Sequence, residues 1–343
     1  MAKLLEEIYG QPDVIRKLQK GLPEGDYQSR LEGKQLFLFG TGASLSACMQ
    51  AKYAFLKYGI HAVAVPAFEA GYYKGLLGKN SVAIVVSQSG ESYETKVIVE
   101  ELMKKEVPFL GITNNKGSFL GKNADKCFPL MAGEELGTAT KTQTASTMTL
   151  YWMAAAGCKH AMEELHKMPE AMEATLEAAE GYKQELADFL SDRKAVYLTG
   201  LDAHAPTAVQ ASLMLKEKVW LHAEGLPLAE FRHGPVEVME EGVPVVLIGH
   251  GKEKMKTLLM HADFLSNVCH GDVALVTDSK EPWIKGYRNF PYVWEGAEIF
   301  SHICATLPFQ LLAERLAAER NYDIDGFKYI GKVLNQYEKK IEV

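Results

Sequence analysis

The sequence Ser81–Val86 (SVAIVV) runs directly into Ser87–Ser92 (SQSGES), and this stretch decides the fold. Five consecutive apolar residues bounded by small and polar ones predict a buried strand. The residues that follow, up to Lys105, have a helical pattern. A strand, a small-residue loop and a helix form the unit from which parallel α/β sheets are built.

The same unit occurs before and after this stretch. Gln35–Phe39 is a predicted strand that ends in the loop Gly40–Ser44 (GTGAS) and is followed by a helix to Tyr58. Further strands are predicted at 61–66, 108–113, 127–130, 195–199, 244–248 and 273–277, and helices at 141–190, with a break near Pro169, and 208–220. Strands that alternate with helices favour parallel sheets covered on both faces, which is a three-layer αβα architecture.

The chain divides into two similar halves in this pattern. We predict an N-terminal helical segment at 1–33, a first α/β domain at 34–160, a helical connection at 161–192, a second α/β domain at 193–320 and a C-terminal tail at 321–343. The two halves repeat the order of elements and not the sequence itself.

Composition excludes several classes of protein. The 343 residues are 47% hydrophobic and 24% charged, and 37 basic against 44 acidic residues give a net charge of 37 − 44 = −7. A mildly acidic chain without a basic tract is a poor nucleic-acid binder. We find neither a signal peptide nor an apolar run of the ~18 residues that span a bilayer, so we expect a cytoplasmic protein with no membrane partner. The five cysteines are scattered singly, four of them among apolar neighbours, which predicts buried thiols without zinc-ligand spacing.

The loop Ser87–Ser92 has the composition of a phosphate site. Ser87, Ser89 and Ser92 offer hydroxyl groups, Gly90 allows close approach of the backbone, and the following helix would present unpaired N–H groups. A simple helix cap is the alternative interpretation of the same residues. The loop Gly40–Ser44 is of a similar kind but is not GxGxxG, which disfavours a dinucleotide site.

Three residues of the second half and the tail are candidates for proton chemistry. Glu217 is predicted near a helix end among apolar residues, where a buried carboxylate suits a general base, although an exposed pair with Lys216 or Lys218 fits equally. His233 lies in Phe231–Pro235 (FRHGP), and a histidine can transfer a proton near neutral pH. The alternative interpretation is an ordinary loop residue. Lys332 lies in the tail, where a solvated lysine is the usual case.

Taken together, these ordered motifs resemble the sugar isomerase (SIS) family. The similarity extends over nearly the whole chain and is greatest to the isomerase half of glucosamine-6-phosphate synthase and to stand-alone deaminases. It is carried by EIYGQP (7–12), GAS (42–44), SQSGES (87–92), TK (140–141), LKE (215–217), HAE (222–224), EFRHGP (230–235) and the segment 323–332. The resemblance implies two flavodoxin-like SIS subdomains.

The resemblance also implies roles for individual residues. Glu217 would move the proton between C1 and C2, His233 would assist ring opening from a loop that reaches the neighbouring subunit, and Lys332 would contact the open-chain sugar. The phosphosugar would be bound by Gly42, Ser44, Ser87, Gln88, Ser89, Ser92 and Lys141. The family chemistry requires no metal and no redox cofactor, and implies a homodimer or a higher homo-oligomer.

Two departures from the synthase pattern bear on the substrate. The synthase pattern has an N-terminal glutaminase domain before the isomerase half, whereas this chain enters the isomerase region directly. We therefore expect no synthesis from glutamine. The expected reaction is release of ammonia from glucosamine 6-phosphate to give fructose 6-phosphate. Met214 stands where the synthase pattern has Lys. A fructosamine-6-phosphate deglycase that releases an amino acid, and a non-catalytic sugar-phosphate sensor, remain the alternatives.

Overall fold

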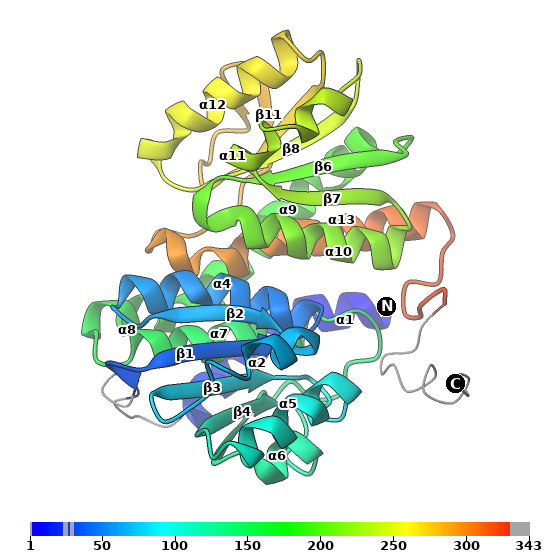
Figure 1. The fold of residues 1–343 in the computed structure, drawn as a ribbon. Coiled ribbons are helices and arrows are strands. Elements are labelled where there is room, and N and C mark those ends of the chain that lie inside the picture. The colour runs from blue at the N-terminus through cyan, green and yellow to red at the C-terminus, as the bar shows by residue number, and fades with distance from the viewer. Residues whose placement is uncertain (1, 23–26, 28–30, 330–343) are drawn as a thin grey trace, which may run out of the picture. The chain divides into compact units, whose positions relative to one another are not determined.

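The computed structural model describes residues 2–22, 27 and 31–329 and divides the chain into two compact units. Unit A comprises residues 13–166 and 326–343, and unit B comprises residues 1–12 and 167–325. Each unit contains one β-sheet with helices on both of its faces (Figure 1). The α/β class predicted from the sequence is confirmed.

Unit A is built on a wholly parallel five-stranded sheet in the order β2-β1-β3-β4-β5. Its strands are β1 (Gln35–Gly40), β2 (Ala62–Pro66), β3 (Ser81–Val86), β4 (Phe109–Thr113) and β5 (Lys126–Pro129). Its helices are α2 (Gln11–Gly21, which begins in unit B), α4 (Ala43–Lys57), the 3-10 helix η1 (Ala67–Tyr73), α5 (Tyr93–Lys104), α6 (Phe119–Asn123), α7 (Lys141–Ala155) and α8 (Lys159–His166).

Side chains from both faces of β1 and β3 are buried, which explains the uninterrupted apolar runs. Phe37 and Phe39 pack with Val85 against Ile98 of α5. Leu36 and Leu38 alternate with them and point to the face where α4 contacts β1. Burying a side chain of this size stabilises the fold by about 1.5–3 kcal/mol.

Unit B contains a six-stranded sheet in the order β10-β11-β9-β8-β6-β7. Its strands are β6 (Ala195–Gly200), β7 (His222–Pro227), β8 (Pro244–Ile248), β9 (Asp272–Val276), β10 (Trp283–Ile284) and β11 (Tyr287–Asn289). Its helices are α1 (Lys3–Tyr9), α9 (Met168–Leu190), η2 (Asp202–His204), α10 (Ala205–Val219), α11 (Leu228–Phe231), η3 (Pro235–Val238), α12 (Lys252–Asn267), η4 (Glu298–Phe300) and α13 (His302–Glu319). This sheet is mixed, because β10 pairs antiparallel with β11.

The two sheets share one strand order. In unit A the first strand lies between the second and the third, and in unit B β6 likewise lies between β7 and β8, with β9 and β11 continuing outward. In unit B, α10 packs on β6 and β7 and on α13, whereas α11 and α12 lie on the other face (Figure 1). Both sheets therefore have the flavodoxin-like order expected from the resemblance.

Several details differ from the sequence expectations. The strand β7 was not predicted, and the region 141–190 contains three helices, with Pro169 in the first turn of α9. Cys48 and Cys304 are buried, but Cys127, Cys158 and Cys269 are partly exposed, so the expectation of four buried thiols was wrong.

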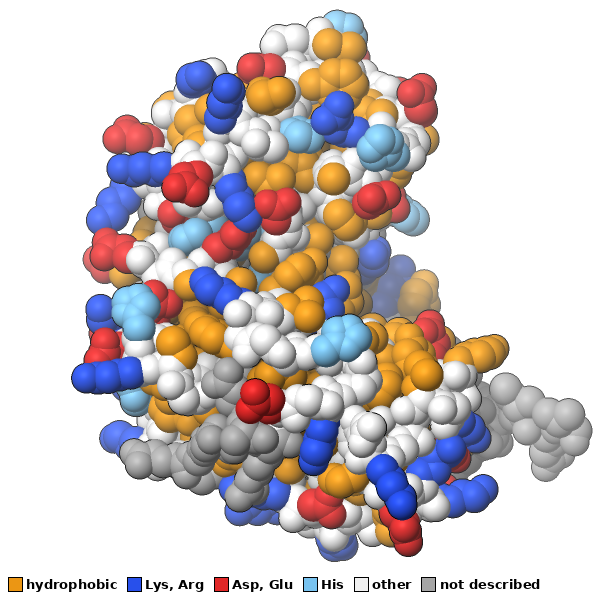
Figure 2. Space-filling model, turned by 60° about the vertical axis from the view of Figure 1, so that its left-hand side comes forward, with side chains coloured by type: hydrophobic (Ala, Val, Ile, Leu, Met, Phe, Trp, Pro, Cys, Tyr) orange, Lys and Arg blue, Asp and Glu red, His pale blue; other side chains and the backbone are white. Residues whose placement is uncertain are grey.

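The surface has no field of one charge sign on the face shown in Figure 2, where acidic and basic side chains occur side by side. Within the described residues, no helix is both long and apolar enough to cross a membrane.

Candidate functional site

Two small-residue loops leave neighbouring strands at the carboxyl edge of the unit A sheet. Gly40–Ser44 follows β1 and opens α4, and Ser87–Ser92 follows β3 and opens α5. β1 and β3 are paired, and the strand order changes direction between them. Such a switch point is where open α/β sheets bind their ligands.

Hydrogen bonds within the loop Ser87–Ser92 fix its shape. Ser87 Oγ accepts a bond from the Gly90 N–H (3.1 Å), and Ser89 Oγ accepts one from the Glu91 N–H (3.3 Å). Ser92 caps α5 by accepting from the Thr95 N–H (3.4 Å). The helix-cap interpretation is thus correct for Ser92, while Gln88 and Ser89 are half-buried at the same edge.

Gly90 is required at its position. Its φ is +67°, and a Cβ placed there would lie 2.1 Å from Ser118 Oγ and 3.0 Å from Thr113 Oγ1. Thr113 Oγ1 in turn donates to the Gln88 carbonyl at 3.1 Å. The loop therefore lies directly on the end of β4 and on Ser118 beyond it, and only a residue without a side chain fits this approach.

The loop after β1 is equally tight. A Cβ on Gly40 would lie 2.7 Å from the Leu45 nitrogen, and Gly42 has φ +57° at the N-cap of α4. Ser44, in the first turn of α4, is half-buried. Both loops open a helix, and the partial positive charge at a helix N-terminus favours an anion.

Lys141 is the first residue of α7. Its Nζ donates to the Glu134 carbonyl at 2.7 Å. The start of α7 is held by buried Glu135, whose Oε1 accepts from the Thr140 and Thr142 N–H groups at 3.0 and 3.1 Å. Sequence reasoning singled out Lys141 and missed Glu135, because the capping carboxylate precedes the helix by six residues.

Glu217 lies in the last turn of α10 in unit B and is half-buried. Trp220, three residues later, adopts a left-handed conformation with φ +53° and ends the helix. Met214, one turn earlier, is 1% exposed and belongs to the core of the unit.

In the unit B sheet, His233 lies toward the carboxyl ends of the parallel strands and Glu217 lies toward their amino ends. His233 is exposed and comes after β7 and α11, beyond the carboxyl end of that strand. Glu217 comes just before β7 begins, because α10 runs back across the sheet. A strand of this length spans roughly 17–20 Å, so the two side chains of one chain are not brought together. Lys332 lies outside the described residues.

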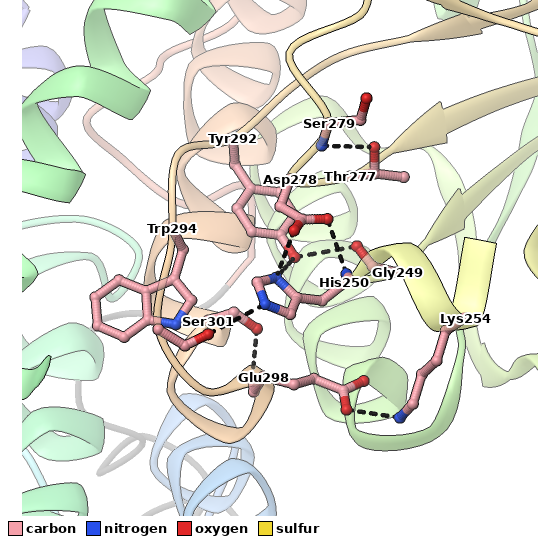
Figure 3. A network of polar contacts seen from close by, with 12 residues as sticks. Gly249, His250, Lys254, Thr277, Asp278, Ser279, Tyr292, Trp294, Glu298 and Ser301 are labelled. Carbon is pink, nitrogen blue, oxygen red and sulfur yellow. Dashed lines mark hydrogen bonds and ion pairs between the residues drawn. The ribbon is translucent and has the colours of Figure 1, made fainter. Parts of the chain in front are cut away.

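A polar network lies at the carboxyl edge of the unit B sheet, the edge that corresponds to the one with the two loops in unit A (Figure 3). His250, after β8, lies 3.1 Å from the Tyr292 hydroxyl and 3.5 Å from Asp278 Oδ2. Tyr292 donates to the Gly249 carbonyl at 3.0 Å. Lys254 pairs with Glu298 at 2.6 Å.

Two further histidines lie at this edge and are fully buried. His204 Nε2 is 3.1 Å from Ser301 Oγ, and His302 Nδ1 is 2.7 Å from Thr207 Oγ1. Burial lowers the pKa of His204 well below its usual value and that of His302 to about 3, so both rings are neutral. Sequence reasoning did not single out this network, since its members are spread from His204 to His302. Among the described residues, no group of three or more His, Cys, Asp or Glu is placed to hold a metal ion.

Comparison with known proteins identifies the first half of the chain. Residues 31–157, which contain the sheet of unit A and both loops at its carboxyl edge, match the family model of the SIS domain. This region is a SIS domain. The recognition made from the sequence is therefore confirmed, and the two loops belong to the SIS domain itself.

Similarity to known relatives extends over the rest of the chain. The glutamine–fructose-6-phosphate aminotransferase (isomerizing) of Pyrobaculum aerophilum is 30% identical over 345 residues and is matched along 96% of this chain. The chain spans 57% of the length of that relative.

Solved structures show the same fold. The C-terminal domain of glucosamine-fructose-6-phosphate aminotransferase from Francisella tularensis superposes with a TM-score of 0.83 at 23% identity, covering 95% of this chain and 98% of that one. The glucosamine-6-phosphate deaminase of Thermotoga maritima has a TM-score of 0.74 at 18% identity, covering 97% and 99%.

Proposed function

We propose that this protein is a phosphosugar isomerase or deaminase that converts glucosamine 6-phosphate, or a closely similar amino sugar phosphate, to fructose 6-phosphate and ammonia. The observation that carries the proposal is the pair of serine- and glycine-containing loops at the β1/β3 switch point of a SIS domain. The relatives named above act on hexose or hexosamine phosphates by their names, which supports this substrate class.

In the proposed mechanism the SIS domain of unit A holds the phosphate. Ser44, Ser87, Gln88, Ser89 and Ser92 would donate to the phosphate oxygens together with the first N–H groups of α4 and α5. Gly42 would allow close approach, and Lys141 would supply positive charge. Binding by hydroxyl and backbone donors is consistent with an acidic protein, since it needs no basic tract.

Proton transfer is assigned to unit B. Glu217 would remove the proton from C2 of the open-chain amino sugar and return it to C1, by way of an enolamine. Water would then add to the resulting C2 imine, and the C–N bond of this adduct would break to give the C2 ketone and ammonia. His233 would assist ring opening and Lys332 would contact the open-chain sugar. Because His233 and Glu217 of one chain lie toward opposite edges of their sheet, we propose that His233 acts in the site of a second copy in a homodimer or larger assembly.

The decisive experiment offers the protein three substrates in parallel. With glucosamine 6-phosphate we expect ammonia and fructose 6-phosphate in equal amounts. Amino acid release from a fructoselysine-type 6-phosphate, with no reaction of glucosamine 6-phosphate, would replace the proposal by the deglycase activity. Binding of fructose 6-phosphate without turnover of either compound would identify a sensor.

The phosphate cradle is tested by two serines at opposite ends of one strand. Ser87→Ala removes a hydroxyl at the carboxyl end of β3, and we expect a weaker affinity for the phosphosugar by roughly tenfold, the loss of one charge-assisted hydrogen bond. Ser81→Ala removes a buried hydroxyl at the start of β3, bonded to the Leu76 carbonyl at 2.9 Å. Equal loss of affinity in both variants would contradict a site at the carboxyl edge.

A further inference from the structure

Lys218, the residue after Glu217, is almost completely buried in the last turn of α10. Its exposed fraction is 1%, and lysine is rarely buried to this extent without acidic partners. Burial lowers the pKa of Lys218, while the charges of Glu217, Asp323, Asp325 and Glu7 act in the opposite direction. By contrast, Lys216 on the same helix is exposed.

The four carboxylates around Lys218 come from three segments of unit B. Glu217 belongs to α10 itself, and Glu7 belongs to α1 and is 2% exposed. Asp323 and Asp325 follow α13. One ammonium group with three donors thus lies among carboxylates of segments that are about 200 and 100 residues away in the sequence.

Other contacts independently bring the same segments together. The carboxylate of Asp325 accepts from the Leu4 N–H at 2.8 Å and the Lys3 N–H at 3.2 Å, and so caps the start of α1. Arg320, which directly follows α13, donates to the Val219 carbonyl at 3.0 Å and to the Ser191 carbonyl at 3.1 Å. The end of α10, the helix α1 and the segment 320–325 therefore meet around Lys218.

We propose that Lys218 is a positioning residue that fixes Glu217 by joining the end of α10 to α1 and to the segment 320–325. The proposal rests on the proposed function in assigning Glu217 to proton transfer. Removing the ammonium group leaves buried Glu7 facing like charges, and the segments then separate. The segment 320–325 leads along the chain to Lys332, so Lys218 also holds the attachment point of the tail.

The first test is hydrogen exchange of the unliganded protein, which needs no activity. In Lys218→Met, whose side chain has a similar length without the charge, we expect amides of 4–9 and 320–325 to exchange at least about tenfold faster. Lys216→Met is the matched control and should exchange like the wild type. Unchanged exchange of both segments in Lys218→Met would overturn the proposal.

The second test measures the pH dependence of turnover. We expect kcat of Lys218→Met to fall by about 10- to 100-fold with KM nearly unchanged, and the acidic limb of the kcat profile to move to higher pH, because a nearby positive charge that favours the ionised carboxylate is gone. Lys218→Arg keeps the positive charge. In this variant the acidic limb of the kcat profile should lie at the wild-type pH, even if the arginine packs less well. A merely structural role lowers the amount of folded protein and leaves the limb in place, and that result would overturn the proposal.

The two tests separate this proposal from the proposed function. If the wild type turns over no phosphosugar, the proposed function fails, and hydrogen exchange still decides whether Lys218 joins the three segments. If the wild type is active and Lys218→Met matches Lys216→Met in exchange and in its pH profile, only the proposal for Lys218 fails.

Discussion

Tyr322 stacks on Trp220, with ring centroids 3.8 Å apart and ring planes inclined by 23°. Trp220 ends α10 and Tyr322 follows α13, so the stack joins the two helix ends. It also covers the turn three residues after Glu217.

We expect Tyr322→Ala to lower the free energy of unfolding of unit B by about 1 kcal/mol, the usual contribution of an aromatic pair. Denaturant unfolding followed by tryptophan fluorescence measures this change. Tyr72→Ala is the control, because Tyr72 is 90% exposed. Equal changes in the two variants would show that the stack contributes nothing.

Gly90→Ala is expected to destabilise unit A by roughly 2 kcal/mol and to abolish phosphosugar binding, because the new Cβ meets Ser118 at a φ of +67°. Gly78→Ala serves as the control, since nothing lies within 4 Å of a Cβ at that position. Thermal denaturation with and without fructose 6-phosphate separates the two effects. A Gly90→Ala protein that binds normally would refute the close approach of this loop.

Glu217→Gln keeps the size of the side chain and removes the base. We expect kcat to fall by about 10²- to 10⁴-fold while the affinity for the phosphosugar changes little. Steady-state kinetics and calorimetric titration measure the two quantities. The control is Glu240→Gln, at an exposed position; turnover near the wild-type rate in Glu217→Gln would remove this residue from the mechanism.

Mixed assemblies test whether His233 acts across subunits. We expect Glu217→Gln and His233→Ala each to be inactive, and a dissociated and reassembled equal mixture to recover about a quarter of wild-type activity, since half of the dimers are mixed and one of their two sites is intact. The yield of mixed dimers is measured with a tag on one variant. Mixed dimers without activity would mean that both residues serve the same subunit.

Stability is expected to fall below about pH 6.5 because His302 is buried and neutral. Its pKa is lowered to about 3 in the folded protein, so the unfolded chain binds the proton first as the pH decreases. Its contribution to stability is therefore complete above pH 6.5 and falls by about 2 kcal/mol by pH 5.

A substitution separates His302 from other groups that titrate in this range. His302→Asn keeps a partner for Thr207 and cannot be protonated, so its stability should depend less on pH. His160→Asn changes a histidine on the surface, where 83% of the side chain is exposed, and should leave the dependence unchanged. Unfolding midpoints at pH 7 and pH 5 measure both variants, and identical slopes would contradict the assignment.

The strands that the sequence shows most directly are those with both faces buried, although the partly exposed edge strands β2 and β5 were predicted as well. β1, β3 and β8 contain uninterrupted apolar runs, because helices cover the sheet on both sides. The edge strand β7 was missed because its sequence, HAEGLP, contains polar residues and Gly225. That glycine was a usable signal: a Cβ there would lie 2.4 Å from the Ala208 carbonyl of α10, which is the close approach that a glycine inside a strand indicates.

The candidate site was predictable where it is local in sequence. Ser87–Ser92 and Gly40–Ser44 each consist of a strand end, a loop and a helix start, and the parallel order places them side by side. The histidine network and the carboxylates around Lys218 were not predictable, because they depend on contacts between segments that are about 100 or more residues apart. The boundaries of the predicted domains remain predictions.

The helix α1 packs against α13, and Gln11, two residues after the end of α1, donates to Gln310 Oε1 at 2.6 Å. Helix α1 therefore belongs to a core whose other half is synthesised about 300 residues later. At ordinary rates of synthesis this delay is roughly 15–60 s, during which residues 13–166 are already available to fold. Helix α1 cannot pack against α13 until that time has passed.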